Sequence, residues 1–198
     1  MLSRLAPAFF ARPSATVARE LLGTFIVQTE GPTTKIARVV EVEAYLGQQD
    51  AASHARRGPT PRAAIMFGPP AHLYVYLVYG MHHCLNVVTE SDGVAGAVLI
   101  RAAEPVRGFA IADQKERAIW RALAGPGKLC AGLEITRRHN GMNLGDSPLY
   151  FANDAEAPPV TQVGVSARIG VAYAGAWAKR KLRFYLRGNP SVSVRPND

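Results

Sequence analysis

Two glutamates and a tyrosine at alternate positions, Glu41, Glu43 and Tyr45, are the first residues whose types and spacing could do chemistry. In a β-strand, side chains two positions apart lie on the same face, so these three would line one side together. Two carboxylates on one face repel each other unless each has a cation or a chemical role. Burial raises the pKa of a carboxyl group and can make it a useful general base. Taken alone, the pattern favours the alternative that both glutamates lie on a solvated face.

An acid and a histidine follow this pattern closely, at Asp50 and His54. An acid, an aromatic ring and an imidazole near one strand end could supply a catalytic acid–base pair. A metal site is the alternative, because imidazole is a common metal ligand and His72, His82 and His83 are also available. Adjacent His82 and His83 would point to opposite faces of a strand, which weakens a shared metal site. We therefore expect no metal.

A second group of residues with chemical potential is an aromatic hairpin with strands predicted over residues 73–79 and 84–89. Its tip would expose Tyr79, Met81 and His82 to solvent. An exposed aromatic tip lowers solubility and needs a reason. On a basic protein, one reason is a wedge inserted between stacked bases of a nucleic acid. The alternative is an ordinary core hairpin whose tyrosines pack on the sheet behind it.

The register of this hairpin is open between two possibilities. A two-residue turn at residues 80–81 would place Tyr76 opposite Leu85. A three-residue loop at residues 80–82 would instead place Tyr76 opposite Asn86, and would bring an aromatic ring and an amide together on one face. The two registers therefore predict different neighbours for the same tyrosine.

The elements that must position these residues are predicted from periodicity and turn signals. Ser14 can cap a helix that ends near Leu22 and is closed by Gly23, and Pro126 can begin a second short helix. Strands are predicted over residues 24–28, 36–46, 97–103 and 181–186, helix-compatible sequence over 109–123, an irregular segment over 47–58, and a loop-rich stretch with short strands over 140–161. No repeat interrupts the chain, so we expect a single mixed domain over residues 1–198.

The charge balance points to the kind of partner. Lysine and arginine number 23 against 15 acidic residues, a net charge of +8, which favours a polyanionic partner over the alternative of a generally basic soluble protein. The two cysteines, Cys84 and Cys130, do not have the spacing of a zinc site and are expected to be buried thiols. No apolar run reaches the roughly 20 residues that a membrane helix needs, and residues 5–11 are interpreted as a packing arm rather than a signal peptide. We expect a cytoplasmic protein, associated with the nucleoid if it is bacterial.

Many short motifs, each weak alone, together resemble one known family in order and spacing, the 3-methyladenine (alkyladenine) DNA glycosylases. The most distinctive are the glutamate–tyrosine strand at 41–47, the hairpin motifs at 74–76, 79–81 and 84–86, and the arginine motif at 99–102. The others lie at residues 18–23, 52–54, 66–69, 104–105, 108, 125–130, 168–171 and 182–188. The resemblance spans nearly the whole chain.

The resemblance implies a fold and an activity. The fold would be α+β, one mixed domain with a curved, mainly antiparallel β-sheet, flanking helices and a protruding β-hairpin. The activity would be DNA base-excision repair on double-stranded DNA: alkylated or deaminated purines of the 3-methyladenine, 7-methylguanine, hypoxanthine and ethenoadenine class are flipped out. The N-glycosidic bond is hydrolysed by a glutamate-activated water, leaving an abasic site. Members of the family need no metal and no cofactor, and we expect a monomer with no membrane association.

The resemblance also implies roles for individual residues. Glu43 would be the general base that activates the water. Tyr45, His54 and Tyr76 would sandwich the flipped base, and Asn86 would exclude normal guanine by a clash with its exocyclic amine. Tyr79 would intercalate, flanked by Met81 and His82. Arg101 would contact the phosphate or sugar beside the lesion, and the further backbone contacts that the positive charge suggests are Arg62, Lys128, Lys179 and Arg180.

Some positions depart from the family pattern, notably Ala63, His82 and Ala71, the last of which stands where glycine is expected; these concern substrate range. A non-catalytic module that recognises distorted duplexes is the alternative function. It would share the basic charge and the wedge, but it would have no use for Glu43.

Overall fold

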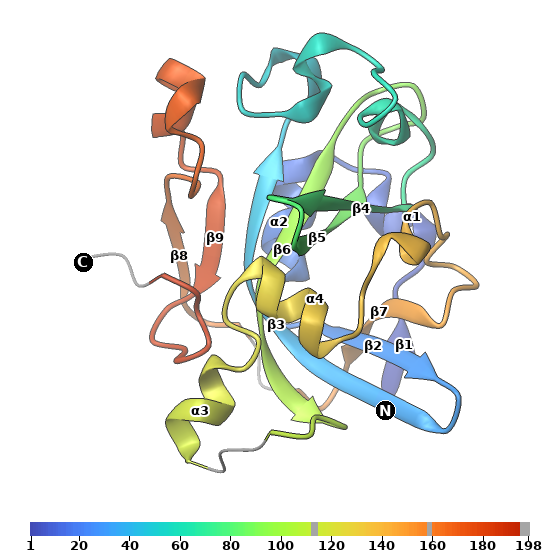
Figure 1. The fold of residues 1–198 in the computed structure, drawn as a ribbon, viewed down its shortest axis with the longest axis vertical. Coiled ribbons are helices and arrows are strands. Elements are labelled where there is room, and N and C mark those ends of the chain that lie inside the picture. The colour runs from blue at the N-terminus through green and yellow to red at the C-terminus, as the bar shows by residue number, and fades with distance from the viewer. Residues whose placement is uncertain (112–114, 158–159, 195–198) are drawn as a thin grey trace.

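The fold is built on one antiparallel β-sheet, seen in a computed structural model that describes residues 1–111, 115–157 and 160–194 (Figure 1). Nine strands are found in the described residues, and every strand pairing among them is antiparallel. The main path runs β1 (Leu2–Arg4), β7 (Leu149–Asp154), β2 (Phe25–Glu30), β3 (Thr33–Tyr45), β6 (Ala97–Arg107), β5 (His82–Val88) and β4 (Leu73–Val78). The predicted α+β class with a curved antiparallel sheet is confirmed.

The long strand β3 is the centre of this sheet. It pairs with β2 and β6, and its last part also pairs with β9 (Arg183–Leu186), which in turn pairs with β8 (Val163–Ser166). Its inward residues, among them Val39, Val40 and Val42, are completely buried, as the β-branched composition predicts. The register against β6 shifts on both sides of Glu41, and such irregularities re-aim side chains near functional sites.

Short helices flank the sheet. These are α1 (Pro7–Phe10), α2 (Ser14–Leu21), α3 (Glu116–Arg121) and α4 (Pro126–Gly132). The second helix buries Val17, Ala18 and Leu21 against the core, and Gly23 takes the left-handed conformation just beyond its end, as predicted. The predicted cap is wrong, because Pro13 occupies the capping position and the Ser14 hydroxyl bonds to Thr89 and Glu90 instead. Pro126 begins α4 as predicted.

Tight 3-10 segments make up several of the connections, and the first two of them lie in the predicted irregular segment at 47–58. They are η1 (Gly47–Gln49), η2 (His54–Arg57), η3 (Ala64–Phe67), η4 (Arg137–His139) and η5 (Ala172–Lys179). The helix-compatible sequence at 109–123 forms a helix only over α3, because β6 continues to Arg107 and takes the chain away in extended form; residues 112–114 lie outside the described part of the chain. Strands β1 and β8 were not predicted: β1 has three residues and β8 four, too few to show a period.

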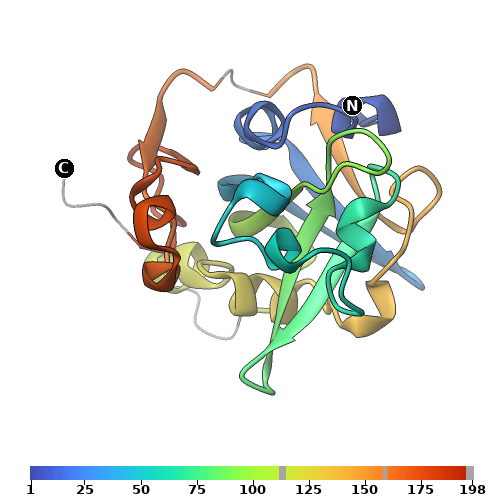
Figure 2. The same cartoon turned by 90° about the horizontal axis from the view of Figure 1, so that it is seen from above.

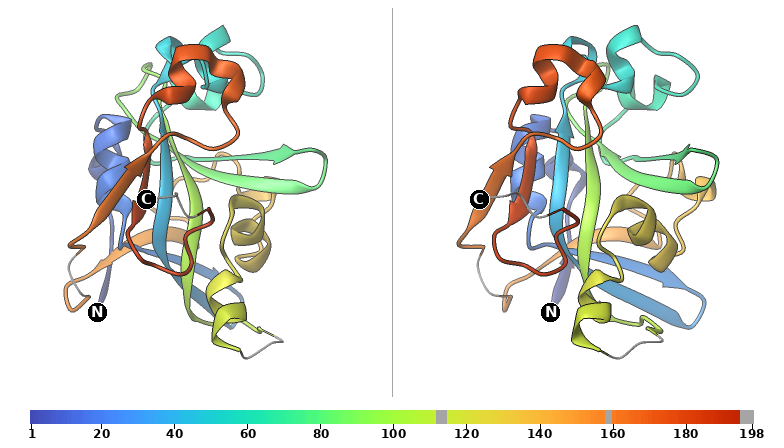
Figure 3. Two further views of the ribbon diagram at one scale, coloured as in Figure 1. Left: turned by 90° about the vertical axis from the view of Figure 1, so that its left-hand side faces the viewer. Right: turned by 60° about the vertical axis from the view of Figure 1, so that its left-hand side comes forward.

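The β4–β5 hairpin projects from the body of the sheet (Figures 2 and 3). Val78 pairs with His82, so the tip is a three-residue loop at residues 79–81, and Tyr76 lies opposite Cys84. Both predicted registers are therefore wrong. The turn begins one residue early because Tyr79, as well as the glycine after it, adopts a positive φ.

The core fills the concave side of the sheet and the space beneath the helices. The predicted packing arm is confirmed, because Phe10 is completely buried against Phe151. Both cysteines are buried free thiols, as expected. Ala71, which departs from the family pattern, is buried with a φ of 62°, a conformation that favours glycine. Within the described residues, no helix is both long and apolar enough to cross a membrane.

Candidate active site

A pocket of about 290 Å³ lies where the base of the hairpin meets the centre of the sheet. Strands β3, β4, β5 and β6 supply its floor and one side, and the segments η2 and η5, which lie at the same end of the molecule in Figure 3, supply the other. The structure brings together here most of the predicted pocket residues. Those that line it are Tyr45, His54, Tyr76, Asn86, Tyr79 and Arg101.

Aromatic rings form one wall of this pocket. The His54 and Tyr76 rings meet edge to face with centroids 4.8 Å apart, and Tyr74 shares a hydrogen bond of 2.8 Å with His54 Nδ1. Burial lowers the pKa of His54 to about 4, and the nearby positive charge of Arg62 acts in the same direction. His54 is therefore neutral at neutral pH. Tyr74 was not assigned to the pocket from sequence, although it shares a strand face with Tyr76.

Asn86 is buried in the pocket beside these rings. Its side-chain amide donates a hydrogen bond of 3.0 Å to the backbone carbonyl of Tyr74, on the partner strand of the hairpin. This bond fixes which way the amide points. Cys84, two pairs further toward the tip, also lines the pocket, and burial raises the pKa of its thiol.

Glu43 is completely buried directly behind the pocket lining. Its Oε1 accepts the Ile169 N–H at 2.8 Å and lies 3.3 Å from Arg101 Nη1, and its Oε2 accepts the Tyr45 hydroxyl at 2.9 Å. Burial raises the pKa of Glu43, and this effect exceeds the opposing influence of Arg101, Ile169 and Tyr45. All three partners line the pocket, so the carboxylate is one contact away from it.

Glu41 is equally buried but has different partners. Its carboxylate accepts hydrogen bonds from Arg101 Nε at 3.0 Å and Arg183 Nε at 2.7 Å, and from the backbone N–H and hydroxyl of Ser193 at 2.6 and 2.9 Å. The interpretation that both glutamates lie on a solvated face is therefore wrong. Arg183 and Ser193 were not identified from sequence, because nothing in their local patterns indicates a buried carboxylate as partner.

The predicted DNA contacts fall into two groups. Arg101 is buried at the pocket, where its guanidinium bridges Glu41 and Glu43. The others lie at the surface. At the hairpin tip, the exposed fractions of Tyr79 and Met81 are 90% and 69%. The remaining exposed residues are His82, Arg62, Lys128, Lys179 and Arg180. The Arg62 guanidinium lies 4.6 Å from the centroid of the Tyr76 ring, and that of Arg180 lies 4.1 Å from the Trp177 ring.

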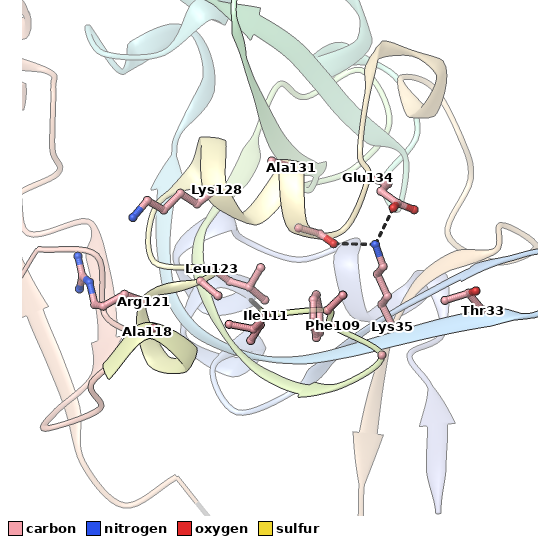
Figure 4. A pocket seen from close by; sticks show the side chains of 14 residues that line it. Thr33, Lys35, Phe109, Ile111, Ala118, Arg121, Leu123, Lys128, Ala131 and Glu134 are labelled. Carbon is pink, nitrogen blue, oxygen red and sulfur yellow. Dashed lines mark hydrogen bonds and ion pairs between the residues drawn. The ribbon is translucent and has the colours of Figure 1, made fainter. Parts of the chain in front are cut away.

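A larger hollow of about 900 Å³ lies elsewhere, between the end of β6 and helices α3 and α4 (Figure 4). Its most prominent charges, Lys35 and Glu134, form an ion pair of 2.9 Å, and Lys35 also donates to the backbone of Gly132. Phe109 is the one aromatic residue among its described lining, and its acid, Glu134, is exposed, so its size does not make it the better candidate. Among the described residues, no cluster of three or more His, Cys, Asp and Glu could hold a metal ion.

A buried carboxylate behind an aromatic pocket, on a basic protein with an exposed aromatic tip, is an arrangement that suits an enzyme acting on a DNA base. The sequence matches the methylpurine-DNA glycosylase (MPG) family over residues 8–190, and the chain belongs to that family. It is thus a DNA glycosylase, a hydrolase of N-glycosyl bonds that acts in base-excision repair of alkylated purines. The predicted resemblance is confirmed, and the non-catalytic alternative is set aside.

Relatives across two domains of life support this assignment. A protein of Anaeromyxobacter dehalogenans (strain 2CP-1 / ATCC BAA-258) is 52% identical over 98% of this chain and 87% of its own length. One of Myxococcus xanthus (strain DK1622) is 45% identical over 97% and 94%. One of Methanocella arvoryzae (strain DSM 22066 / NBRC 105507 / MRE50) is 47% identical over 96% of both chains. All three are named as candidate 3-methyladenine DNA glycosylases.

Proposed function

We propose that the protein flips 3-methyladenine and related damaged purines out of double-stranded DNA and hydrolyses their N-glycosidic bond with a water activated by Glu43. The observation that carries this proposal is the placement of Glu43, a buried carboxylate with a raised pKa whose three hydrogen-bonding or ionic partners all line the pocket. The product is an abasic site with an intact strand, because none of the described residues that line the pocket is a lysine that could form a covalent intermediate.

In the proposed reaction, Glu43 accepts one proton from the attacking water. A carboxylate oxygen accepts about two hydrogen bonds, and Tyr45 is the one donor to Oε2 within the described residues, so a lone pair remains for the attacking water. The water oxygen bonds to the sugar carbon, its proton passes to Glu43, and the bond electrons leave with the base. The ionised carboxylate also stabilises positive charge on the sugar. A positioned general base contributes about 10²- to 10⁴-fold.

The pocket walls suit a purine that carries positive charge. Tyr45 and Tyr76 offer aromatic faces, and His54 is neutral at neutral pH because its pKa is about 4, so cation–π attraction is not opposed by a charged wall. Cationic 3-methyladenine and 7-methylguanine are also good leaving groups. Hypoxanthine and ethenoadenine are neutral and need a proton or a strong hydrogen bond on the departing base.

The fixed amide of Asn86 supports a role in excluding normal guanine. Its hydrogen bond to the Tyr74 carbonyl holds the side chain rigid, so the amide cannot turn aside for an exocyclic amine.

The surface around the pocket supports duplex binding. Tyr79, Met81 and His82 at the exposed hairpin tip would enter the helix and occupy the space of the flipped base, at an unstacking cost of about a few kcal/mol per step. Arg62, Lys128, Lys179 and Arg180 would contact phosphates. Since a single chain carries every proposed site residue, we expect a monomer to be active.

The test is base release from duplexes that carry a single 3-methyladenine, 7-methylguanine, hypoxanthine or ethenoadenine, read as alkali-labile abasic sites. We expect release of at least the two cationic bases by the wild-type protein, and release slowed by about 10²- to 10⁴-fold in Glu43→Gln, which should still bind the lesion duplex. Tyr79→Ala should weaken binding to lesion duplexes while leaving the fold intact. Wild-type rates in Glu43→Gln would overturn the proposal.

A further inference from the structure

Asp50 and Arg168 form a buried ion pair that the mechanism above does not use. Both side chains have no exposed surface. Arg168 Nη1 lies 2.5 Å from Asp50 Oδ2, and Nη2 lies 2.8 Å from Oδ1, so the two planar groups meet in a bidentate pair. Neither residue lines the pocket.

The pair joins the end of β3 and the turn after it to a segment 118 residues later in the sequence. Arg168 also donates to the backbone carbonyls of Ala44, at the end of β3, and of Trp177, in η5. Asp50 accepts the backbone N–H groups of Leu46 and Ala52, which fixes the turn after β3. The end of β3, this turn and η5 are thereby held in one arrangement.

Two donors to Glu43 depend directly on this arrangement. The N–H that bonds Glu43 Oε1 belongs to Ile169, the residue next to Arg168. The hydroxyl that bonds Oε2 belongs to Tyr45, whose ring lies under the Arg168 guanidinium with 4.7 Å between them. One donor is therefore covalently attached to Arg168, and the other is stacked against it.

We propose that Asp50 and Arg168 are positioning residues of the active site, which hold the Ile169 N–H and the Tyr45 hydroxyl on the two oxygens of Glu43. The inference rests on the proposed role of Glu43 as the general base. Stability alone is a weak reason for such a pair, since well-packed apolar residues often replace a buried ion pair without loss of stability. Fixing the orientation of a catalytic carboxylate is a role that apolar residues cannot fill.

The consequence is a change in the acidity of Glu43 when the pair is broken. Hydrogen bonds to a carboxylate favour its charged form, so losing the Ile169 and Tyr45 bonds raises the pKa of Glu43 further. As the solution is acidified, the rate of base release by such a variant should therefore begin to fall at a higher pH than it does in the wild-type protein. The other charged and titratable groups that act on Glu43 are Arg101 on β6, Glu41 on β3, Cys84 on β5 and Arg168 itself, whose positive charge the Arg168→Lys variant retains.

The experiment compares Asp50→Asn and Arg168→Lys with the wild-type protein in single-turnover release of 7-methylguanine from a duplex, from about pH 5 to about pH 9. We expect about a tenfold lower rate at neutral pH, and an acid limb moved upward by about half a unit to one unit. Affinity for a duplex with a non-hydrolysable abasic analogue should change little. Arg168→Lys keeps the positive charge and serves if Asp50→Asn folds poorly.

Two further variants calibrate the result. Tyr45→Phe removes one donor to Glu43 directly, so its acid limb should move in the same direction. Glu20→Gln breaks an exposed ion pair with Arg12 away from the site and should leave the acid limb unchanged. An Asp50→Asn or Arg168→Lys protein with the wild-type acid limb, whatever its melting temperature, would overturn the inference. Base release by Glu43→Gln at the wild-type rate would instead overturn the proposed function itself.

Discussion

Glu41 and Glu43 lie on one strand, contact the same arginine and are equally buried, but their surroundings differ in kind. Glu41 is paired with the guanidinium groups of two arginines and receives two further hydrogen bonds from Ser193. Glu43 has one arginine at 3.3 Å, and its remaining partners are an uncharged amide and a phenol.

This difference separates a structural acid from the proposed catalytic acid on the same strand. Glu41 has enough positive charge around it to act as a fixed anchor for Arg101 and for the C-terminal segment. The positive charge and the hydrogen bonds around Glu43 do not offset the effect of its burial, so its pKa is raised. The proposed base is the carboxylate that the fold leaves incompletely neutralised.

The difference between Glu41 and Glu43 is tested most directly by removing each charge in turn and measuring catalysis. Glu43→Gln should lower single-turnover base release by about 10²- to 10⁴-fold, because no other side chain replaces the base. Binding to a lesion duplex, measured by fluorescence anisotropy, should be largely retained. A residual rate near that of the wild type would mean that the two glutamates do not differ as described.

Glu41→Gln should have its main effect on stability. It leaves Arg101 and Arg183 buried with reduced compensation, and breaking a buried ion pair costs about 3–5 kcal/mol. The free energy of unfolding from urea denaturation measures this cost. An unfolding free energy equal to that of the wild type would contradict the anchor role of Glu41.

Glu43→Gln should show the opposite stability effect. Because the pKa of Glu43 is raised in the folded protein, its ionised form opposes folding at neutral pH, and this cost disappears as the pH falls through that pKa. The variant should therefore equal or exceed the wild type in stability at neutral pH, and the difference should vanish in acid. Urea unfolding at neutral and acid pH tests the sign; a destabilised variant at neutral pH would refute it.

The smallest expected effect concerns Ser193. Ser193→Ala removes the hydroxyl donor to Glu41 but keeps the backbone donor, so about 1 kcal/mol of stability should be lost. Base release should keep its wild-type rate and its wild-type dependence on pH. A shifted acid limb would show that the hydrogen bonds of Glu41 affect the pKa of Glu43, contrary to the separate roles described above.

Much of the fold was predictable from local pattern. The alternation of β3, the start of α4 at Pro126 and the aromatic hairpin are short-range features, and each was found where the sequence predicts it. The hairpin register was not, because it depends on the backbone of a single residue: Tyr79 adopts a positive φ that side chains other than glycine seldom take.

The sequence by itself determined the residue types of the site, their order and the family to which the chain belongs. Only the tertiary structure decided that both glutamates are buried and which of them is fully compensated. The partners of Glu41 lie 60, 142 and 152 residues away in the chain, and the amide that bonds Glu43 lies 126 residues away. Burial and the pKa of a carboxyl group depend on what surrounds it in space, and no local spacing encodes neighbours that only folding brings together.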